Sequence, residues 1–268
     1  MGGTASSNIT VTGFSAHDNK GDGIGIIAGN NLQSGNTAII IQNSSFYNNS
    51  GGPNPDSGIR LDTNTNNVTI KYNKLYGNQS AGVVAEDGAH DNAILYNLSY
   101  LNARGITHSN NSGTGNVYYG NTLYGNTLDG FQVYASTNPA TIKNNIFATN
   151  GRYGYSTDGG SHVVDYNLSD GNAIADYSGI TKPANDATGD PRFKNAATGD
   201  FTLLPGSPAI DAGVDLGPAY RMGLAPGTSF PTSTLNQDNQ GSGWEIGAFV
   251  FVRQMPPSPP TSISVTVR

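Results

Sequence analysis

The fold is decided by a six-residue segment that occurs four times, as NKLYGN (73–78), NLSYLN (97–102), NTLYGN (121–126) and NIFATN (145–150). Each copy begins 24 residues after the one before it, and related segments end at Asn19 and Asn49. A constant period of this length is typical of a solenoid in which every repeat contributes one coil.

Two further short strands complete each predicted coil. A Gly follows each copy and opens an apolar alternation, as in Gly58-Ile59-Arg60-Leu61, and a strand such as Val68-Thr69-Ile70 precedes it. Strands this short are unstable alone, but stacked coils pair each strand with its equivalent about 4.8 Å above and below. The sequence therefore predicts an all-β parallel β-helix, a single-stranded solenoid of about seven coils with an irregular C-terminal cap.

The period also predicts which residues stack along the axis. Like residues lie on like in such a solenoid, so repeated Asn side chains can form a hydrogen-bonded ladder at one corner. The Gly before the second strand is expected to supply a positive φ or a tight corner. Two columns are predicted: an inner one of Ile70, Ile94, Tyr118 and Ile142, and an Asn ladder of Asn73, Asn97, Asn121 and Asn145.

The loss of the 24-residue rhythm after Gly171 predicts the domain boundaries. Residues 1–170 are expected to form the coils, and residues 171–254 the C-terminal coil and capping region of the same domain. An open solenoid end exposes strand edges and core, so a cap over that end is expected. Residues 255–268 begin with a Pro-rich stretch, which predicts a linker and the start of a truncated further domain.

The pattern N-x-(L/F)-Y-x-N followed by G-I-x-L resembles the secreted bacterial right-handed parallel β-helix proteins of the pectate-lyase-like superfamily. The resemblance runs from about Asn8 to Val252, and GDFTL (199–203), PGSPAIDAG (205–213) and GWEIGAF (243–249) look like the closing segments of these proteins. It implies right-handed coils and a secreted or cell-surface location of bacterial type, although no signal sequence precedes the repeats. The family includes polysaccharide lyases, uronan epimerases, glycosidases and proteins without known activity.

Composition narrows the partners. The formal net charge is −6 and no cysteine is present. An excess of acidic groups argues against nucleic acid, which needs Lys and Arg to contact phosphate. No apolar run approaches the length of a membrane-spanning helix. We expect a polysaccharide partner, no membrane insertion and a monomer.

One charged patch stands out on the second strand of the predicted coils. Alternation directs Ile59 and Leu61 inward and Arg60 and Asp62 outward, with Glu86 one coil away from Asp62 and Asp87 beside it. The resemblance implies an Arg or Lys base acting after Ca²⁺ has neutralised a uronate, with Arg60 or Lys71 as catalytic residue and Asp62, Glu86 and Asp87 as Ca²⁺ ligands. The alternative is a surface Arg that pairs with neighbouring carboxylates and contributes little. The loop from Gly51 to Ser57 is expected to form one wall beside Arg60.

Aromatic and amide side chains supply the substrate-binding candidates Tyr119, Gln132 and Tyr134. Tyr119 belongs to an outward column with Leu95, which either lies under a segment of the cap or lines a groove. Tyr47, Tyr76, Tyr100 and Tyr124 form another column, which is either a structural ladder or a sugar-binding stripe.

Two function classes remain open at this point. The first is a Ca²⁺-assisted lyase or epimerase acting on a uronic-acid-containing polysaccharide. The second is a non-catalytic carbohydrate-binding or cell-surface structural or adhesive module. The Arg60 patch favours the first, whereas the small number of catalytic candidates and the negative charge favour the second, and the fold alone does not decide.

Overall fold

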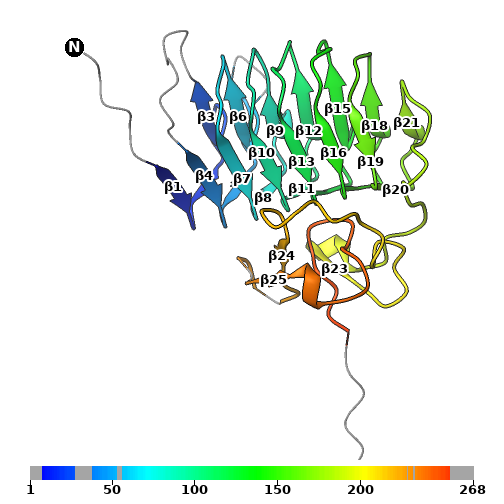
Figure 1. Cartoon of the computed structure of the whole chain (residues 1–268). Coiled ribbons are helices and arrows are strands. Elements are labelled where there is room, and N and C mark those ends of the chain that lie inside the picture. Colours follow the sequence, from blue (N-terminus) through cyan, green and yellow to red (C-terminus); the bar gives the residue numbers. More distant parts are fainter. Residues whose placement is uncertain (1–7, 28–37, 53–55, 228, 232, 254–268) are drawn as a thin grey trace, which may run out of the picture.

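The computed structural model describes residues 8–27, 38–52, 56–227, 229–231 and 233–253 of the 268. Its main body is a solenoid of seven coils, and each coil contributes one strand to each of three parallel sheets (Figure 1). The predicted all-β parallel β-helix is confirmed.

The strands of a coil follow one another as A, B and C. Sheet A contains β1 (Ile9–Thr12), β4 (Ile39–Gln42), β7 (Val68–Lys71), β10 (Ala93–Leu95), β13 (Val117–Tyr119), β16 (Thr141–Lys143) and β19 (Val163–Asp165). Sheet B contains β2 (Ser15–His17), β5 (Ser45–Tyr47), β8 (Lys74–Tyr76), β11 (Leu98–Tyr100), β14 (Thr122–Tyr124), β17 (Ile146–Ala148) and β20 (Leu168–Asp170). Sheet C contains β3 (Ile24–Ile27), β6 (Ile59–Asp62), β9 (Ala81–Ala85), β12 (Arg104–Ser109), β15 (Phe131–Tyr134), β18 (Tyr153–Thr157) and β21 (Ala175–Ser178).

Strand register follows the repeat. Ile94 of β10 pairs with Ile70 on one side and with Tyr118 on the other, and Tyr118 pairs with Ile142. All four side chains are fully buried, which confirms the predicted inner column. Apolar residues of each coil therefore join one continuous core, as expected of a solenoid.

The predicted Asn ladder is present and extends further than expected. Asn73, Asn97, Asn121 and Asn145 are fully buried, and each donates from Nδ2 to Oδ1 of the next at 3.0 Å. Asn145 continues the ladder by donating to Asn167. The residue just before each Asn has a positive φ, as at Tyr72 and Tyr96, so the corner itself lies there.

The Gly residues before the strands of sheet C have a different role from a positive φ. A Cβ at Gly58 would lie 2.7 Å from the carbonyl oxygen of Gly82 and 3.0 Å from Leu75. Gly58 is absent from the positive-φ residues. Of the two expectations, the tight corner is therefore the correct one, because close approach of neighbouring coils leaves no room for a side chain.

The C-terminal region does not lie only over the end of the solenoid. Ala187 bridges to Leu168, and Asp186 accepts a hydrogen bond from the Asn167 amide, so this short segment does cover the last coil. The rest of the region lies along the flank of the solenoid (Figure 1). It contains β22 (Phe193–Asn195), β23 (Asp200–Leu203), β24 (Met222–Leu224), β25 (Thr234–Asn236) and the 3₁₀ turns η1 (Ala196–Thr198) and η2 (Gln237–Asn239).

Outward apolar side chains explain why the flank is covered. Leu95, Tyr96 and Leu98 pack with Phe201 and Leu224 in a second apolar cluster, outside the core of the coils. Burying these large side chains removes a broad apolar surface from water. Within the described ranges no helix is both long and apolar enough to cross a membrane. The predicted linker and further domain at 255–268 lie outside the described residues.

Candidate functional site

A groove of about 1140 Å³ runs along the outer face of sheet C, from Asp22 in the first coil to Ser178 in the seventh. Charged and polar side chains from all seven coils line it, because outward positions of successive strands fall in columns. The lining residues used below are Lys20, Asp22, Asp56, Arg60, Asp62, Thr107, Glu86, Asp87, Arg104, Gln132, Tyr134, Arg152, Ser156 and Asp158.

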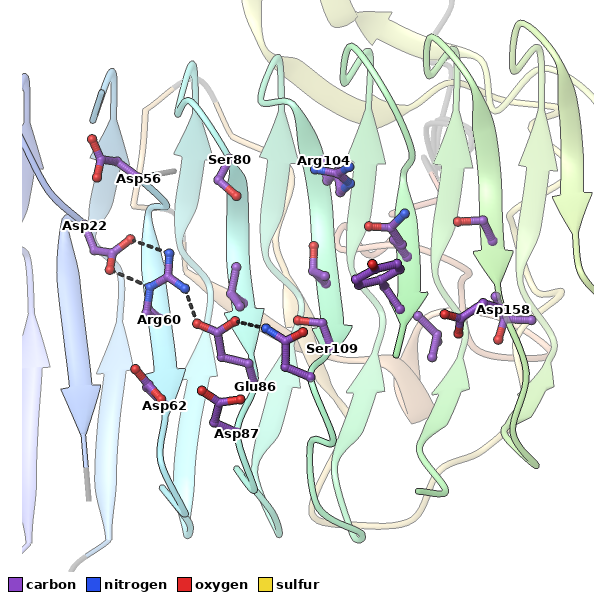
Figure 2. Close-up of a pocket in the computed structure, with 18 of the residues that line it drawn as sticks. Asp22, Asp56, Arg60, Asp62, Ser80, Glu86, Asp87, Arg104, Ser109 and Asp158 are labelled. Atoms are coloured by element: carbon purple, nitrogen blue, oxygen red, sulfur yellow. Dashed lines mark hydrogen bonds and ion pairs between the residues drawn. The ribbon is translucent and has the colours of Figure 1, made fainter. Parts of the chain in front are cut away.

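Arg60 lies between two carboxylates near the N-terminal end of the groove. Its Nε donates to Asp22 at 2.7 Å, and its Nη1 donates to Glu86, as the dashed lines in Figure 2 show. Glu86 also accepts from the side chain of Asn110 at 3.0 Å. Burial opposes the charge of Arg60, but the hydrogen bonds and charges of Asp22 and Glu86 outweigh it and raise the Arg60 pKa. Arg60 is thus held protonated.

Arg104 is the contrasting cation of this groove. In the part of the chain that the structure describes, its guanidinium makes no hydrogen bond or ion pair, and its Nε is buried without a partner. Figure 2 shows Arg104 apart from the hydrogen bonds of Arg60, because it lies on β12, two strands further along sheet C than β6. Burial lowers the pKa of Arg104, Asp129 opposes this, and Arg152 adds to the lowering. A half-buried guanidinium with an unsatisfied N–H group favours a ligand that accepts hydrogen bonds, and an anion accepts them best.

Asp129 lies beneath the groove with a fully buried side chain. It binds Arg152 in a bidentate manner, with Oδ1 accepting from Nε at 2.9 Å and Oδ2 from Nη2 at 2.6 Å. Ser156 also donates to its Oδ2 at 3.1 Å. These hydrogen bonds raise the pKa of Arg152, although burial opposes them. The charge of Asp129 also acts on Arg104 in the preceding coil, whose pKa it raises against the effect of burial.

The predicted Ca²⁺ ligands share one end of the groove without forming a metal cluster. Both oxygens of Glu86 are engaged, one by Arg60 and the other by Asn110. Asp62 accepts a hydrogen bond from the neighbouring Thr63 hydroxyl at 2.8 Å. Over the described ranges no group of three or more His, Cys, Asp or Glu side chains is arranged to hold a metal. The donor set as it stands does not fit Ca²⁺, and calcium remains an untested prediction.

The structure brings six of the eight predicted site residues together. Arg60, Asp62, Glu86, Asp87, Gln132 and Tyr134 all line the groove. Lys71 and Tyr119 lie on sheet A instead, as the last residues of β7 and β13. Tyr119 is half-buried with its ring 5.1 Å from the ring of Tyr220, so its column lies under the C-terminal region. We therefore assign neither Lys71 nor Tyr119 to the site.

The remaining predictions about this surface have mixed outcomes. The tip of the Gly51–Ser57 loop lies outside the described residues, although Asp56 at its end does line the groove. The rings of Tyr47, Tyr76 and Tyr100 stack on one another at 4.8 and 5.1 Å, on sheet B. Because a stacked ring uses its faces on its neighbours, this column is a structural ladder.

Three functional residues escaped the sequence pattern. Asp22 lies in a turn before β3, where no period links it to Arg60 across 38 residues. Strict alternation from Ile106 assigns Arg104 to the inner side, yet it is the first residue of β12 and reaches the groove. Arg152 precedes β18 and belongs to no column. Asp22 and Arg104 share one signal, a charged residue directly before the repeated Gly, as in Asp22-Gly23 and Arg104-Gly105. Arg152 does not share it, because Tyr153 stands between Arg152 and Gly154.

Solved structures with a similar fold include two enzymes. A mutant of the periplasmic alginate epimerase AlgG matches with a TM-score of 0.57 and 21% identity, over 69% of this chain and 45% of that one. The pectate lyase Pel9A matches with a TM-score of 0.50 and 15% identity, over 92% of this chain and 88% of that one. The chain thus spans less than half of the epimerase's length, and likeness at these identities establishes the fold alone. No curated protein sequence matches the chain.

A family model provides the stronger link. The model described as "Right handed beta helix region" matches residues 2–138, which is about half of the chain. The match spans β1 to β15 and so includes Arg60, Glu86 and Arg104 of the groove. This chain therefore belongs to the family of proteins with a right-handed β-helix region.

Proposed function

We propose that the groove on sheet C binds a uronic-acid-containing polysaccharide and that the protein acts on it as a lyase or epimerase. The observation that carries this proposal is Arg104, whose buried Nε makes no hydrogen bond and which lies in the fourth coil of a groove that spans seven. A uronate carboxylate is the anion that such a guanidinium would bind well, and successive coils offer polar side chains to neighbouring sugars.

The groove residues suggest distinct roles in proton abstraction. Arg104 is a better base than Arg60. Burial lowers the pKa of Arg104, whereas Asp22 and Glu86 raise the pKa of Arg60. Arg152, held by Asp129, would bind the carboxylate and stabilise negative charge that develops beside it. Thr107, Gln132 and Ser156 form the adjacent outward column and would orient the sugar ring.

The chemistry of the two reactions shares its first step. With the carboxylate held by Arg152, Arg104 in its deprotonated form would accept the proton from the carbon next to that carboxylate, and the electron pair would be delocalised into it. In elimination the electron pair then forms a carbon–carbon double bond, and the bond from the neighbouring carbon to the glycosidic oxygen breaks. That oxygen departs with the bonding electrons and takes up a proton, and an unsaturated uronide remains. In epimerisation a proton returns to the same carbon from the opposite face.

The first test combines two readouts on pectate, alginate and glycosaminoglycan substrates. Absorbance of unsaturated uronide reports elimination, and exchange of the abstracted proton in deuterated water, followed by NMR, reports both reactions. We expect Arg104→Ala to abolish both, and Arg221→Ala, an exposed Arg of the C-terminal region, to leave both unchanged. Equal activity of the Arg104→Ala protein would place the base elsewhere.

The alternative function is recognised by the same experiment. If the wild-type protein binds a uronan but shows neither elimination nor exchange, with Ca²⁺ or with EDTA, the protein is a non-catalytic binding module. Dependence on Ca²⁺ in these assays would bear out the calcium prediction. Because uronans lie in the periplasm or outside the cell, the proposal includes a location beyond the cytoplasm.

A further inference from the structure

The two ends of the groove differ in charge. We call the lining over β3, β6 and β9 the acidic half, with the carboxylates Asp22, Asp56, Asp62, Glu86 and Asp87 and the cations Lys20 and Arg60. We call the lining over β12, β15 and β18 the basic half, with the cations Arg104 and Arg152 and the carboxylate Asp158. Carboxylates exceed cations by three in the acidic half. In the basic half cations exceed carboxylates by one among the lining residues, and the buried Asp129 beneath them, which binds Arg152, makes this half neutral.

Hydrogen bonding sharpens this difference. In the acidic half the charge of Arg60 is already matched by Asp22 and Glu86, so it offers little to a uronate. Asp62 is half-exposed and Asp87 is exposed, so both face a chain lying in the groove. In the basic half Arg104 makes no ion pair with a described residue, and Asp129, the carboxylate whose charge acts on it, is already bonded through both oxygens to Arg152. A carboxylate is thus favoured over β12 and disfavoured over β6 and β9.

Because the coils are stacked, a polymer that lies along the groove contacts both halves, and their difference in charge limits where the polymer can carry carboxylates. The groove follows the axis of the solenoid, and successive coils are about 4.8 Å apart. Asp62 and Arg104 are therefore about two coils apart along the axis, and they lie on opposite edges of sheet C, because Asp62 ends β6 and Arg104 begins β12. Both line the one groove in which a polysaccharide chain would lie. A homouronan carries a carboxylate on every sugar, so it would place negative charges beside Asp62, Glu86 and Asp87, where like charges repel.

We infer that the groove selects a uronan whose charge is interrupted, with a free carboxylate at Arg104 and uncharged sugars over the acidic half. The inference rests on the proposed function and names the substrate class of that site. The acidic half acts here as a specificity determinant that rejects adjacent uronates.

Graded esterification tests the inference, because an ester removes the charge and leaves the sugar in place. Polygalacturonate with low, intermediate and high methyl esterification, and alginate with matching propylene glycol esters, are titrated into the protein in EDTA and low salt by calorimetry. We expect intermediate esterification to bind best, about tenfold tighter than the unesterified polymer. Salt should reduce the discrimination, since it screens the repulsion between exposed charges.

A charge-neutralising variant and a matched control identify the cause. Asp62→Asn combined with Asp87→Asn should raise affinity for unesterified polymer about tenfold and leave that for highly esterified polymer unchanged. Asp190→Asn combined with Asp215→Asn changes the net charge equally at exposed positions of the C-terminal region and should alter neither affinity.

The outcomes distinguish the selection of an interrupted uronan from the proposed function. If unesterified polymer binds best, or if both double variants behave alike, the selection rule is overturned while the proposed function stands. If no uronan binds at any degree of esterification, the proposed function fails and the rule fails with it.

Discussion

Asn97 donates from Nδ2 to Oδ1 of Asn121 at 3.0 Å and to the carbonyl oxygen of Ile70 at 2.9 Å. The Oδ1 of Asn97 in turn accepts from the backbone and the side chain of Asn73. One fully buried side chain thus satisfies polar groups in both neighbouring coils, where no water can replace it.

Asn97→Ala should therefore lower the free energy of unfolding by about 1–3 kcal/mol, the cost of leaving buried groups unpaired. Urea denaturation at neutral pH measures it. Asn195→Ala serves as the control, because Asn195 is exposed and its side chain makes no capping hydrogen bond. An equal stability of the two variants would show that the corner does not depend on the ladder.

Gly58→Ala should destabilise the protein by about 1–3 kcal/mol, because its Cβ would press on the carbonyl of Gly82 in the next coil. Gly25→Ala is a matched control in the same sheet, since a Cβ there meets nothing within 4 Å. Thermal unfolding of both variants compares them. A similar loss at the two positions would mean that strand flexibility, not the contact between coils, requires Gly.

His108 should make the protein sensitive to acid. It is fully buried inside the solenoid, with Nδ1 3.0 Å from the Tyr118 hydroxyl. Burial, helped by the nearby His162, lowers the pKa of His108 from 6.5 to about 4. The unfolded chain therefore binds this proton first, and stability falls as the pH drops from about 6.5 to 4, by about 3 kcal/mol.

His108→Gln removes this titration and should flatten that part of the stability curve. Chemical denaturation at pH 7 and pH 4.5 provides the comparison, and His90→Gln, at a less buried position, provides the control. If the loss of stability in acid is the same with and without His108, other groups cause it.

Glu245 should produce the opposite dependence. Both of its carboxyl oxygens are buried. Burial raises the pKa of Glu245 to about 7 and Asp211 adds to this, although backbone N–H groups and Arg253 oppose it. The folded protein keeps this proton longer than the unfolded chain, so stability falls as the pH rises from about 4.5 to 7.

Glu245→Gln should therefore stabilise the protein at pH 8 relative to pH 5, by up to about 3 kcal/mol. Thermal unfolding of the wild type and the variant at these two pH values measures the difference. Identical pH dependence of the two proteins would contradict a buried carboxyl at this position.

The solenoid could be predicted because one residue type repeats where one backbone geometry repeats. The Asn73 series and the column of Ile70 have a period of 24 residues, and the physics of stacking leaves few alternatives. The placement of the C-terminal region could not be predicted in the same way. Contacts such as the hydrogen bond from Tyr96 to Tyr220 join residues 124 apart, and no periodicity records them.

The residues of the candidate site could be predicted from the sequence only where they follow the 24-residue period. Arg60 and Glu86 lie in outward columns, and the sequence identified both. Asp22 and Arg152 act from turns between strands, where side-chain direction depends on local backbone geometry. The proposal for Arg104 depends on its buried Nε, which makes no hydrogen bond, and this can be recognised only from the positions of all the surrounding groups.

The independence of the coils has a consequence for how such a protein can change over generations. Each coil contacts chiefly its two neighbours, so duplication of one 24-residue unit would insert a new rung without altering the remainder. The groove would gain one further row of side chains, free to mutate separately from the rows around Arg104. A longer reach along a polymer, or a new preference at one position of it, is then available by gene duplication within a single solenoid.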